Sequence, residues 1–307
     1  MFNFSRSLTL AASGIALAFG SVAAASDTPP APVATTTIPA TGTPALWKVA
    51  DEDTTIYLFG TVHVLPQGID WYGPRIEQAL TSSDELITEI PSGPETDAKM
   101  QQLVMTNGML PPDENLRDKL SAEDRATYEG GLAKIGLPAN AFDRFEPWMA
   151  DLTLTVLPLV QQGYSPDAGV EKQLEGKAGA GIQRGALETV EYQIGIFDSM
   201  AAEAQIEFLI AAAEMVEETK PMLDAMVAEW LEGDADALAA IMNEEMSDPV
   251  VAEALLYKRN ANWAEWIDAR MEQPGTVFIA VGAGHLAGER SVQDLLAQRG
   301  LTSERVQ

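Results

Sequence analysis

The chain has 307 residues, of which 46% are hydrophobic, enough for a sizeable core in one large domain or two small ones. Its formal net charge is −27, and no run of Lys or Arg supplies the basic face that a nucleic-acid partner would need. There are no cysteines, which excludes disulfides, zinc–thiolate sites, iron–sulfur clusters and cysteine nucleophiles.

Residues 1–25 have the pattern of a secretory signal peptide. Arg6 is the only charged residue there, an apolar run follows over 8–19, and the alanines at 23–25 offer a small-residue cleavage site. The apolar run is short for a transmembrane helix, although an uncleaved anchor has the same local pattern. We expect a periplasmic or secreted protein with no stable membrane insertion after cleavage.

Residues 26–45 are rich in Pro, Thr and Ala, which is typical of an extended, disordered tether. We expect the rest of the chain, 46–307, to form a single domain. Its first two predicted strands, 46–49 and 55–59, flank an acidic turn and form a hairpin. A short helix after Pro74 and a strand over 85–90 complete a βαβ unit with the second of these strands.

Helical patterns fill most of the remaining chain. We expect helices at 121–136 and 147–162, across most of 190–272 and at 291–299. A second β segment covers 181–188, and a nearly all-apolar strand over 276–281 is expected to be buried on both faces. The predicted fold class is α/β, with a mixed central β-sheet built from two strand–Gly-x-x-His–helix halves and flanked by many helices.

The two histidines of the chain both stand in Gly-x-x-His turns that follow apolar strands. Gly60 precedes His63, and Gly282 precedes His285, each by three residues. Glycine lets the chain turn out of a strand and lets backbone N–H groups approach a ligand closely. Since open α/β sheets bind ligands at the carboxyl ends of their strands, we expect both histidines at one site. Two unrelated structural histidines would leave the same local pattern.

Four further residues are candidates for the site. Glu89 ends a short apolar strand, where a carboxylate is costly unless it is paired or binds a cation. With His63 and His285 it would form a His/His/Glu site for Mn²⁺, Co²⁺ or Zn²⁺, although a solvent-facing glutamate looks the same in sequence. Glu188 is a weaker candidate, because a helix N-terminal carboxylate explains it equally well. Arg259 and Asn260 are weaker still, because a solvated helix face is the better explanation on composition alone.

These motifs together resemble the TraB/GumN family. The resemblance is carried over about 46–300 by the segments 58–64, 86–90, 185–193, 259–263 and 281–288. The family is similar to the Tiki metalloproteases and, more distantly, to erythromycin-esterase-like and ChaN-like proteins. The resemblance implies an α/β fold with His63, Glu89 and His285 in one cleft, and with Arg259 and Asn260 matching the Arg-Asn pair of the family.

The preferred hypothesis is an exported metal-dependent hydrolase that acts on peptides or proteins. The metal would activate water, Glu188 would serve as general base or further ligand, and Arg259 and Asn260 would stabilise the tetrahedral intermediate. The alternative is a non-catalytic binding protein that sequesters a peptide, haem or metal in the same cleft. The sequence leaves a homodimer open.

Overall fold

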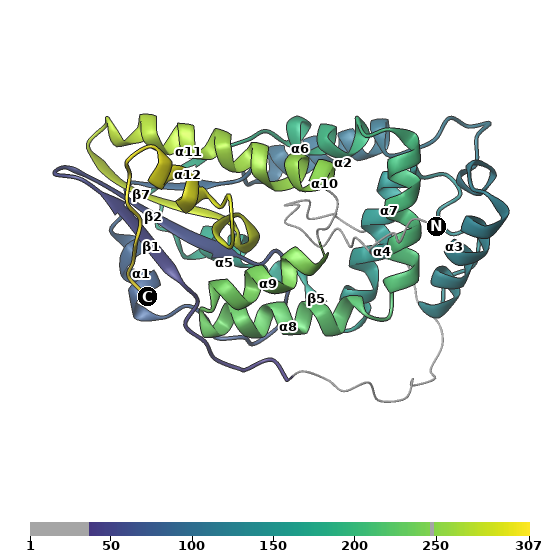
Figure 1. Ribbon diagram of the computed structural model, residues 1–307, viewed down its shortest axis with the longest axis horizontal. Coiled ribbons are helices and arrows are strands. Elements are labelled where there is room, and N and C mark those ends of the chain that lie inside the picture. Colours follow the sequence, from purple (N-terminus) through teal and green to yellow (C-terminus); the bar gives the residue numbers. More distant parts are fainter. Residues whose placement is uncertain (1–36, 246–248) are drawn as a thin grey trace.

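The structure, a computed structural model, describes residues 37–245 and 249–307 and is built around a six-stranded mixed sheet (Figure 1). The strand order is β6-β4-β7-β2-β1-β8. The strands are β1 (Leu46–Ala50), β2 (Thr54–Thr61), β4 (Glu85–Thr88), β6 (Gln183–Ala186), β7 (Gly275–Gly282) and β8 (Glu304–Arg305). The four strands from β6 to β2 are mutually parallel. At the edge beyond β2, β1 pairs antiparallel with β2, and β8 pairs antiparallel with β1. The predicted α/β class with a mixed sheet is confirmed.

The two strands that carry the Gly-x-x-His turns are direct neighbours. β2 and β7 pair in parallel, with Gly60 opposite Val281 and Thr61 opposite Gly282. β7 is buried from Val277 to its end, as its nearly all-apolar sequence predicts. Helix α1 (Pro74–Thr81) leads from β2 to β4 as expected, but β7 is inserted between these two strands.

Helices cover both faces of the sheet. On one face, β1, β2 and β7 pack against α1, α5 (Val170–Lys177) and α8 (Thr219–Glu232). On the other face they pack against α11 (Lys258–Met271) and α12 (Val292–Gln298). This arrangement leaves the carboxyl ends of β2, β4 and β7 pointing toward the helical part of the molecule (Figure 1).

The helical part contains two further apolar clusters centred on α4 (Pro147–Gln161). The predicted helices over 121–136 and 147–162 appear as α3 and α4, and Ser121 caps α3 by accepting from the backbone N–H of Asp124. Besides α1, α5, α8, α11 and α12, the α-helices of the described residues are α2 (Pro94–Asn107), α3 (Ala122–Lys134), α4 (Pro147–Gln161), α6 (Val190–Asp198), α7 (Ala202–Met215), α9 (Ala235–Glu245) and α10 (Pro249–Ala252). A small second sheet pairs β3 (Leu65–Pro66) with β5 (Tyr164–Ser165), which the sequence analysis missed.

The described end of the predicted tether is attached to the domain. The backbone N–H of Asp70 donates to Ala40 at 2.8 Å, Gly42 donates to Asp70 at 3.0 Å, and Thr43 donates to Leu231 at 2.7 Å. The predicted signal peptide and residues 26–36 of the tether lie outside the described residues.

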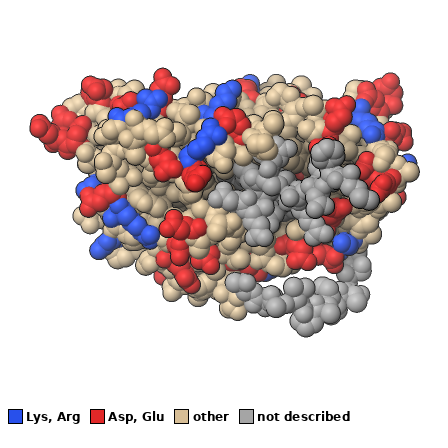
Figure 2. Space-filling view, in the orientation of Figure 1, with Lys and Arg blue, Asp and Glu red and all other residues tan. Residues whose placement is uncertain are grey.

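Charged side chains are mixed over the face of the molecule shown in Figure 2. Lys and Arg side chains lie singly or in small groups among acidic ones on this face. Within the described ranges, none of the helices has the length and apolar character needed to cross a bilayer.

Candidate functional site

The two Gly-x-x-His turns meet at the ends of β2 and β7. A Cβ on Gly60 would lie 3.0 Å from the Cα of Ala283, so the first turn packs directly against the second. The backbone N–H of Gly282 donates to Glu89 Oε1 at 2.7 Å, which joins the end of β4 to the same place. The strand ends of β2, β4 and β7 are thus drawn together as the sequence predicts.

His285 is fully buried, and both of its ring nitrogens have partners. Nδ1 lies 2.5 Å from Asn260 Oδ1, and Nε2 lies 3.1 Å from Arg259 Nη1. The Asn260 amide donates from Nδ2 to the carbonyl of Arg290, which leaves Oδ1 as the acceptor for the Nδ1 proton. Burial and the adjacent Arg259 charge hold the pKa of His285 well below its ordinary value. His285 is therefore a neutral imidazole whose Nε2 lone pair accepts from Arg259.

Arg259 is the cation at the centre of this network, and only 2% of its side chain is exposed. Its Nη2 donates to Glu89 Oε2 at 2.6 Å and to Glu188 Oε2 at 2.8 Å, and its Nε donates to Glu188 Oε1 at 2.9 Å. Gln193 Nε2 donates to both carboxylates at 3.0 Å, and Trp263 Nε1 donates to Glu188 at 3.0 Å. One guanidinium thus holds two buried carboxylates in a fixed arrangement.

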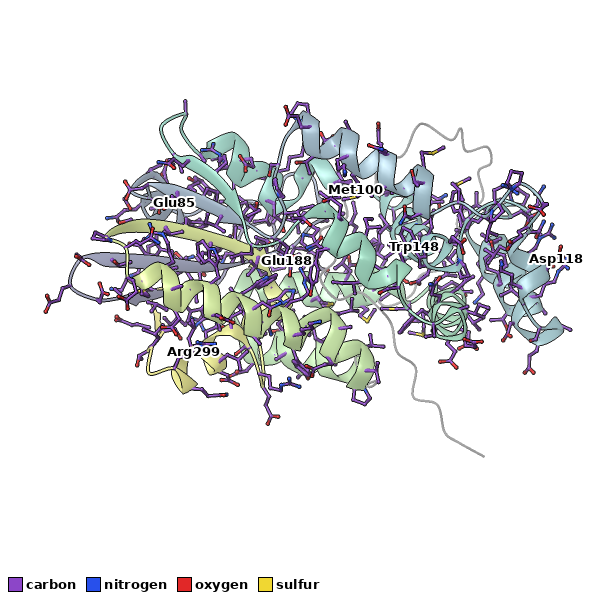
Figure 3. All side chains as sticks on the ribbon, turned by 90° about the horizontal axis from the view of Figure 1, so that it is seen from above. Glu85, Met100, Asp118, Trp148, Glu188 and Arg299 are labelled. Atoms are coloured by element: carbon purple, nitrogen blue, oxygen red, sulfur yellow. The ribbon has the colours of Figure 1, made fainter. Side chains whose placement is uncertain are left out.

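The network lies where the sheet meets the helical part, and α11 and the loop before α12 shape it. Glu188 lies between the strands and the helices that carry Met100 and Trp148 (Figure 3). A π-helical turn, Glu253–Tyr257, directly precedes α11, and such turns are frequent at functional sites. Arg290 has φ 57°, an uncommon value for a residue with a Cβ, and its carbonyl accepts from Asn260.

His63 has different surroundings from His285. Its Nδ1 forms an ion pair with Glu171 Oε1 at 2.5 Å, and the hydroxyl of Thr61 donates to the same oxygen. Its Nε2 is buried and has no hydrogen-bond partner among the described residues. Burial lowers the pKa of His63, but the charge and hydrogen bond of Glu171 outweigh it and raise the pKa to about 9.

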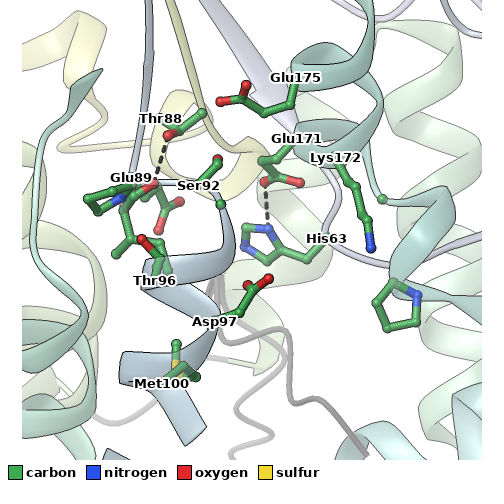
Figure 4. A pocket seen from close by; sticks show the side chains of 15 residues that line it. His63, Thr88, Glu89, Ser92, Thr96, Asp97, Met100, Glu171, Lys172 and Glu175 are labelled. Atoms are coloured by element: carbon green, nitrogen blue, oxygen red, sulfur yellow. Dashed lines mark hydrogen bonds and ion pairs between the residues drawn. The ribbon is translucent and has the colours of Figure 1, made fainter. Parts of the chain in front are cut away.

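A cavity of about 420 Å³ opens in front of His63 (Figure 4). Its charged lining consists of His63, Glu89, Asp97, Glu171, Lys172 and Glu175. Three of the four carboxylates have a cationic partner, since Glu89 pairs with Arg259, Glu171 with His63 and Glu175 with Arg184. Among the described residues, only Glu89 both lines this cavity and belongs to the buried network around Arg259.

The structure divides the predicted site into two parts. Glu89, Glu188, Arg259, Asn260 and His285 lie together in the buried network, and His63 lies on the cavity side of Glu89. Within the described residues, 37–245 and 249–307, no group of three or more His, Asp or Glu side chains lies close enough together to hold a metal ion. The predicted His63/Glu89/His285 ligand set is thus not assembled, because the Arg259 guanidinium takes the Nε2 lone pair of His285.

Two residues of the site were missed in the sequence analysis. Glu171 does not follow a predicted strand, so the pattern that singled out Glu89 does not apply to it. It lies in the first turn of α5, where a carboxylate is common because it is stabilised by the helix dipole. Gln193 lies in the segment 185–193 that carries the family resemblance, but nothing in the sequence indicates that its amide joins two carboxylates.

Comparisons with known proteins agree with the resemblance. The chain is 26% identical over 270 residues to an uncharacterized protein of Treponema pallidum (strain Nichols), covering 83% of this chain and 80% of that protein. It is 21% identical over 252 residues to the uncharacterized protein YbaP of Escherichia coli (strain K12), covering 78% and 87%. No solved structure matches the chain. The profile of the TraB/PrgY/gumN family matches residues 45–305, nearly the whole described domain, and the chain therefore belongs to this family.

Proposed function

We propose that this chain is an exported metal-dependent hydrolase that cleaves peptide bonds at the cavity in front of His63. The observation that carries the proposal is the buried Nε2 of His63, which has no hydrogen-bond partner among the described residues, in the wall of this cavity. A buried ring nitrogen without a partner costs free energy unless a ligand supplies that partner. The carboxylate oxygens of Glu89 and Asp97, which line the same cavity, are donor atoms suited to a divalent cation.

His63 and Glu89 are the two residues that would hold Mn²⁺, Co²⁺ or Zn²⁺, with water completing the coordination, and the metal would displace the Nε2 proton that the raised pKa of His63 implies. Metal-bound histidines almost always have their second ring nitrogen hydrogen-bonded to a carboxylate or carbonyl, and Glu171 has this relation to His63. Glu89 lines the same cavity; its Oε2 already accepts from Arg259 and Gln193, and its Oε1, which accepts from the Gly282 N–H, has a second lone pair for a ligand. A bound divalent metal would supply an activated water and polarise a peptide carbonyl.

His285 does not fit as a metal ligand in this arrangement. Its Nε2 accepts from Arg259 and its Nδ1 is hydrogen-bonded to Asn260, so neither nitrogen has a lone pair directed at the cavity. We assign His285 the task of fixing Arg259, which in turn fixes Glu89 at the cavity wall. Neither Glu188 nor Asn260 lines the cavity, so their catalytic roles stay predictions.

The test is metal uptake and peptide cleavage by the purified chain. We expect the wild type to bind Mn²⁺, Co²⁺ or Zn²⁺ in isothermal titration, and His63→Ala to bind the same metal at least tenfold more weakly. We also expect cleavage products by mass spectrometry from a broad peptide library, lost with a chelator and in His63→Ala. Metal uptake that does not depend on His63 would refute this mechanism.

A non-catalytic binder is the second candidate, because Glu188, Arg259 and Asn260 do not line the cavity and have partners in the buried network. Glu188 pairs with Arg259, and Asn260 is hydrogen-bonded to His285 and to the carbonyl of Arg290. Such a protein would sequester a peptide, haem or metal at His63. Full occupancy by a ligand with no turnover of any library peptide would favour it. For haem, the Soret band of the loaded wild type is compared with that of His63→Ala.

A further inference from the structure

We infer that Arg290 is a positioning residue whose backbone carbonyl, acting through Asn260, determines which ring nitrogen of His285 carries the proton. The inference rests on the proposed function, in which His285 fixes Arg259 and Arg259 fixes Glu89 at the cavity wall. Arg290 lies in the loop between β7 and α12, just beyond the segment 281–288 that carries part of the family resemblance, and no sequence pattern singled it out.

Arg290 has an uncommon backbone conformation that is held on both sides. Its φ of 57° lies in the left-handed region, which few residues with a Cβ adopt. Its N–H donates to Asp294 Oδ2 at 2.9 Å, and the next residue, Ser291, caps α12. Its carbonyl accepts from the Nδ2 of Asn260, also at 2.9 Å. Two hydrogen bonds therefore offset the cost of the left-handed conformation, and the second of them reaches a buried side chain.

The direction of the Asn260 amide determines the tautomer of His285. Because Nδ2 donates to Arg290, Oδ1 faces His285 Nδ1 at 2.5 Å and requires a proton there. If the amide were turned over, Oδ1 would face the Arg290 carbonyl oxygen, and Nδ2 would force the His285 proton onto Nε2. That proton would then face the Nη1 donor of Arg259, which lies 3.1 Å from Nε2. The Arg290 carbonyl and the Arg259 guanidinium thus require the same tautomer from opposite ends.

Other contacts fix the ring of His285 but not the position of its proton. The ring of Trp263 lies 4.2 Å from that of His285, centroid to centroid, and His285 is fully buried. Burial and the Arg259 charge hold the pKa of His285 well below its ordinary value, so the ring is neutral and carries one proton. Since a neutral ring has nearly the same shape in both tautomers, its hydrogen-bond partners select between them.

The side chain of Arg290 contributes less than its backbone. The guanidinium carbon lies 4.0 Å from the ring centroid of Tyr257, and Nη1 pairs with Glu253 at 2.9 Å. Both partners belong to the π-helical turn before α11. The ion pair is half exposed, and exposed pairs stabilise a protein little. Substitutions of Arg290 can therefore separate the effect of its backbone from that of its guanidinium.

The experiment observes the ring nitrogens of His285 by ¹⁵N NMR of the full chain labelled in histidine. Protonated and unprotonated ring nitrogens resonate far apart, and His63→Gln assigns the spectrum because the chain has only two histidines. We expect one neutral form in the wild type, with the proton on Nδ1. Arg290→Val has a β-branched side chain that opposes a positive φ and should show a second form, with the proton on Nε2. The Nδ1 proton should also exchange with water at least about tenfold faster than in the wild type.

Arg290→Asn is the matched control. It removes the guanidinium as Arg290→Val does, but asparagine adopts the left-handed conformation readily, so we expect the wild-type spectrum. Asn260→Leu removes the amide that connects Arg290 to His285 and should show the second form as well. Adding Arg290→Val to Asn260→Leu should then change nothing further. Circular dichroism of each variant shows that the fold is kept.

The outcomes separate the inference from the proposed function. A wild-type spectrum of Arg290→Val or of Asn260→Leu would overturn the inference. Equal changes in Arg290→Val and Arg290→Asn would also overturn it, because loss of the guanidinium would then explain the effect. None of these measurements involves turnover, so a chain that cleaves no peptide would overturn the proposed hydrolase and leave the role of Arg290 in the tautomer of His285 intact.

Discussion

At the scale of single residues, the two histidines have the same sequence motif but opposite electrostatic surroundings. His63 faces Glu171, which favours its charged form, and His285 faces Arg259, which favours its neutral form. The Gly-x-x-His pattern predicted that both would reach the strand ends, and both do. Their partners could not be predicted, because Glu171 and Arg259 come from helices whose packing depends on the whole fold.

The free energy of unfolding should depend on pH through His63. Its pKa is raised from 6.5 to about 9 in the folded chain, so the stabilisation from its proton is fully present below pH 6.5. That stabilisation is lost as the pH rises toward 9. Urea unfolding of chelated protein should show this decline for the wild type and not for His63→Gln. Parallel pH curves for the two proteins would contradict the assignment.

Loss of Arg259 should be severe. Arg259→Met leaves Glu89 and Glu188 as buried carboxylates without their cation, and we expect a loss of about 3–5 kcal/mol in the free energy of unfolding. The control is Arg299→Met, which breaks an exposed pair with Asp268 and should cost at most about 1 kcal/mol. Similar losses for both variants in urea unfolding would show that the network does not depend on Arg259.

At the scale of elements, periodicity and capping predicted most helices and strands. Ser121 marks the start of α3 and Pro147 the start of α4, and the apolar run before Gly282 is a strand buried on both faces. The insertion of β7 between β2 and β4 could not be predicted, since strand order depends on pairing over long sequence distances. The pair β3 and β5 is too short to leave a periodic pattern.

Helix α5 packs against the first Gly-x-x-His turn, where the N–H of Val170 donates to the carbonyl of Val62 at 3.0 Å. This contact gives a prediction for two glycines at the two ends of the helix. Gly169→Ala would force a Cβ against the backbone carbonyl of His63, and we expect a loss of about 1–3 kcal/mol in the free energy of unfolding. Gly176→Ala in the same helix has no atom within 4 Å of its new Cβ and should stabilise the chain by about 0.5–1 kcal/mol. Thermal and urea unfolding measure the stability of both variants. An unchanged stability of Gly169→Ala would show that α5 can move away from His63 at no cost.

At the scale of the whole molecule, the domain extends to residues before the predicted boundary at 46. Three backbone hydrogen bonds join Ala40, Gly42 and Thr43 to the rest of the domain. At about 0.5–1.5 kcal/mol each, their loss should destabilise a chain that begins at 46 by about 2–4 kcal/mol relative to one that begins at 37. Urea unfolding of the two truncated chains tests this prediction. Equal stabilities would support the predicted start of the domain at residue 46.

The parallel pairing of β2 with β7 also determines when the site is formed. β2 ends at Thr61 and β7 begins at Gly275, so the contact between the two Gly-x-x-His turns closes a loop that contains most of the protein. Glu89 cannot be fixed at the cavity wall until Gly282 and Arg259 have reached it. A growing or truncated chain that lacks the last strand and its turn therefore has the residues that line the cavity but not the contacts that hold Glu89 among them.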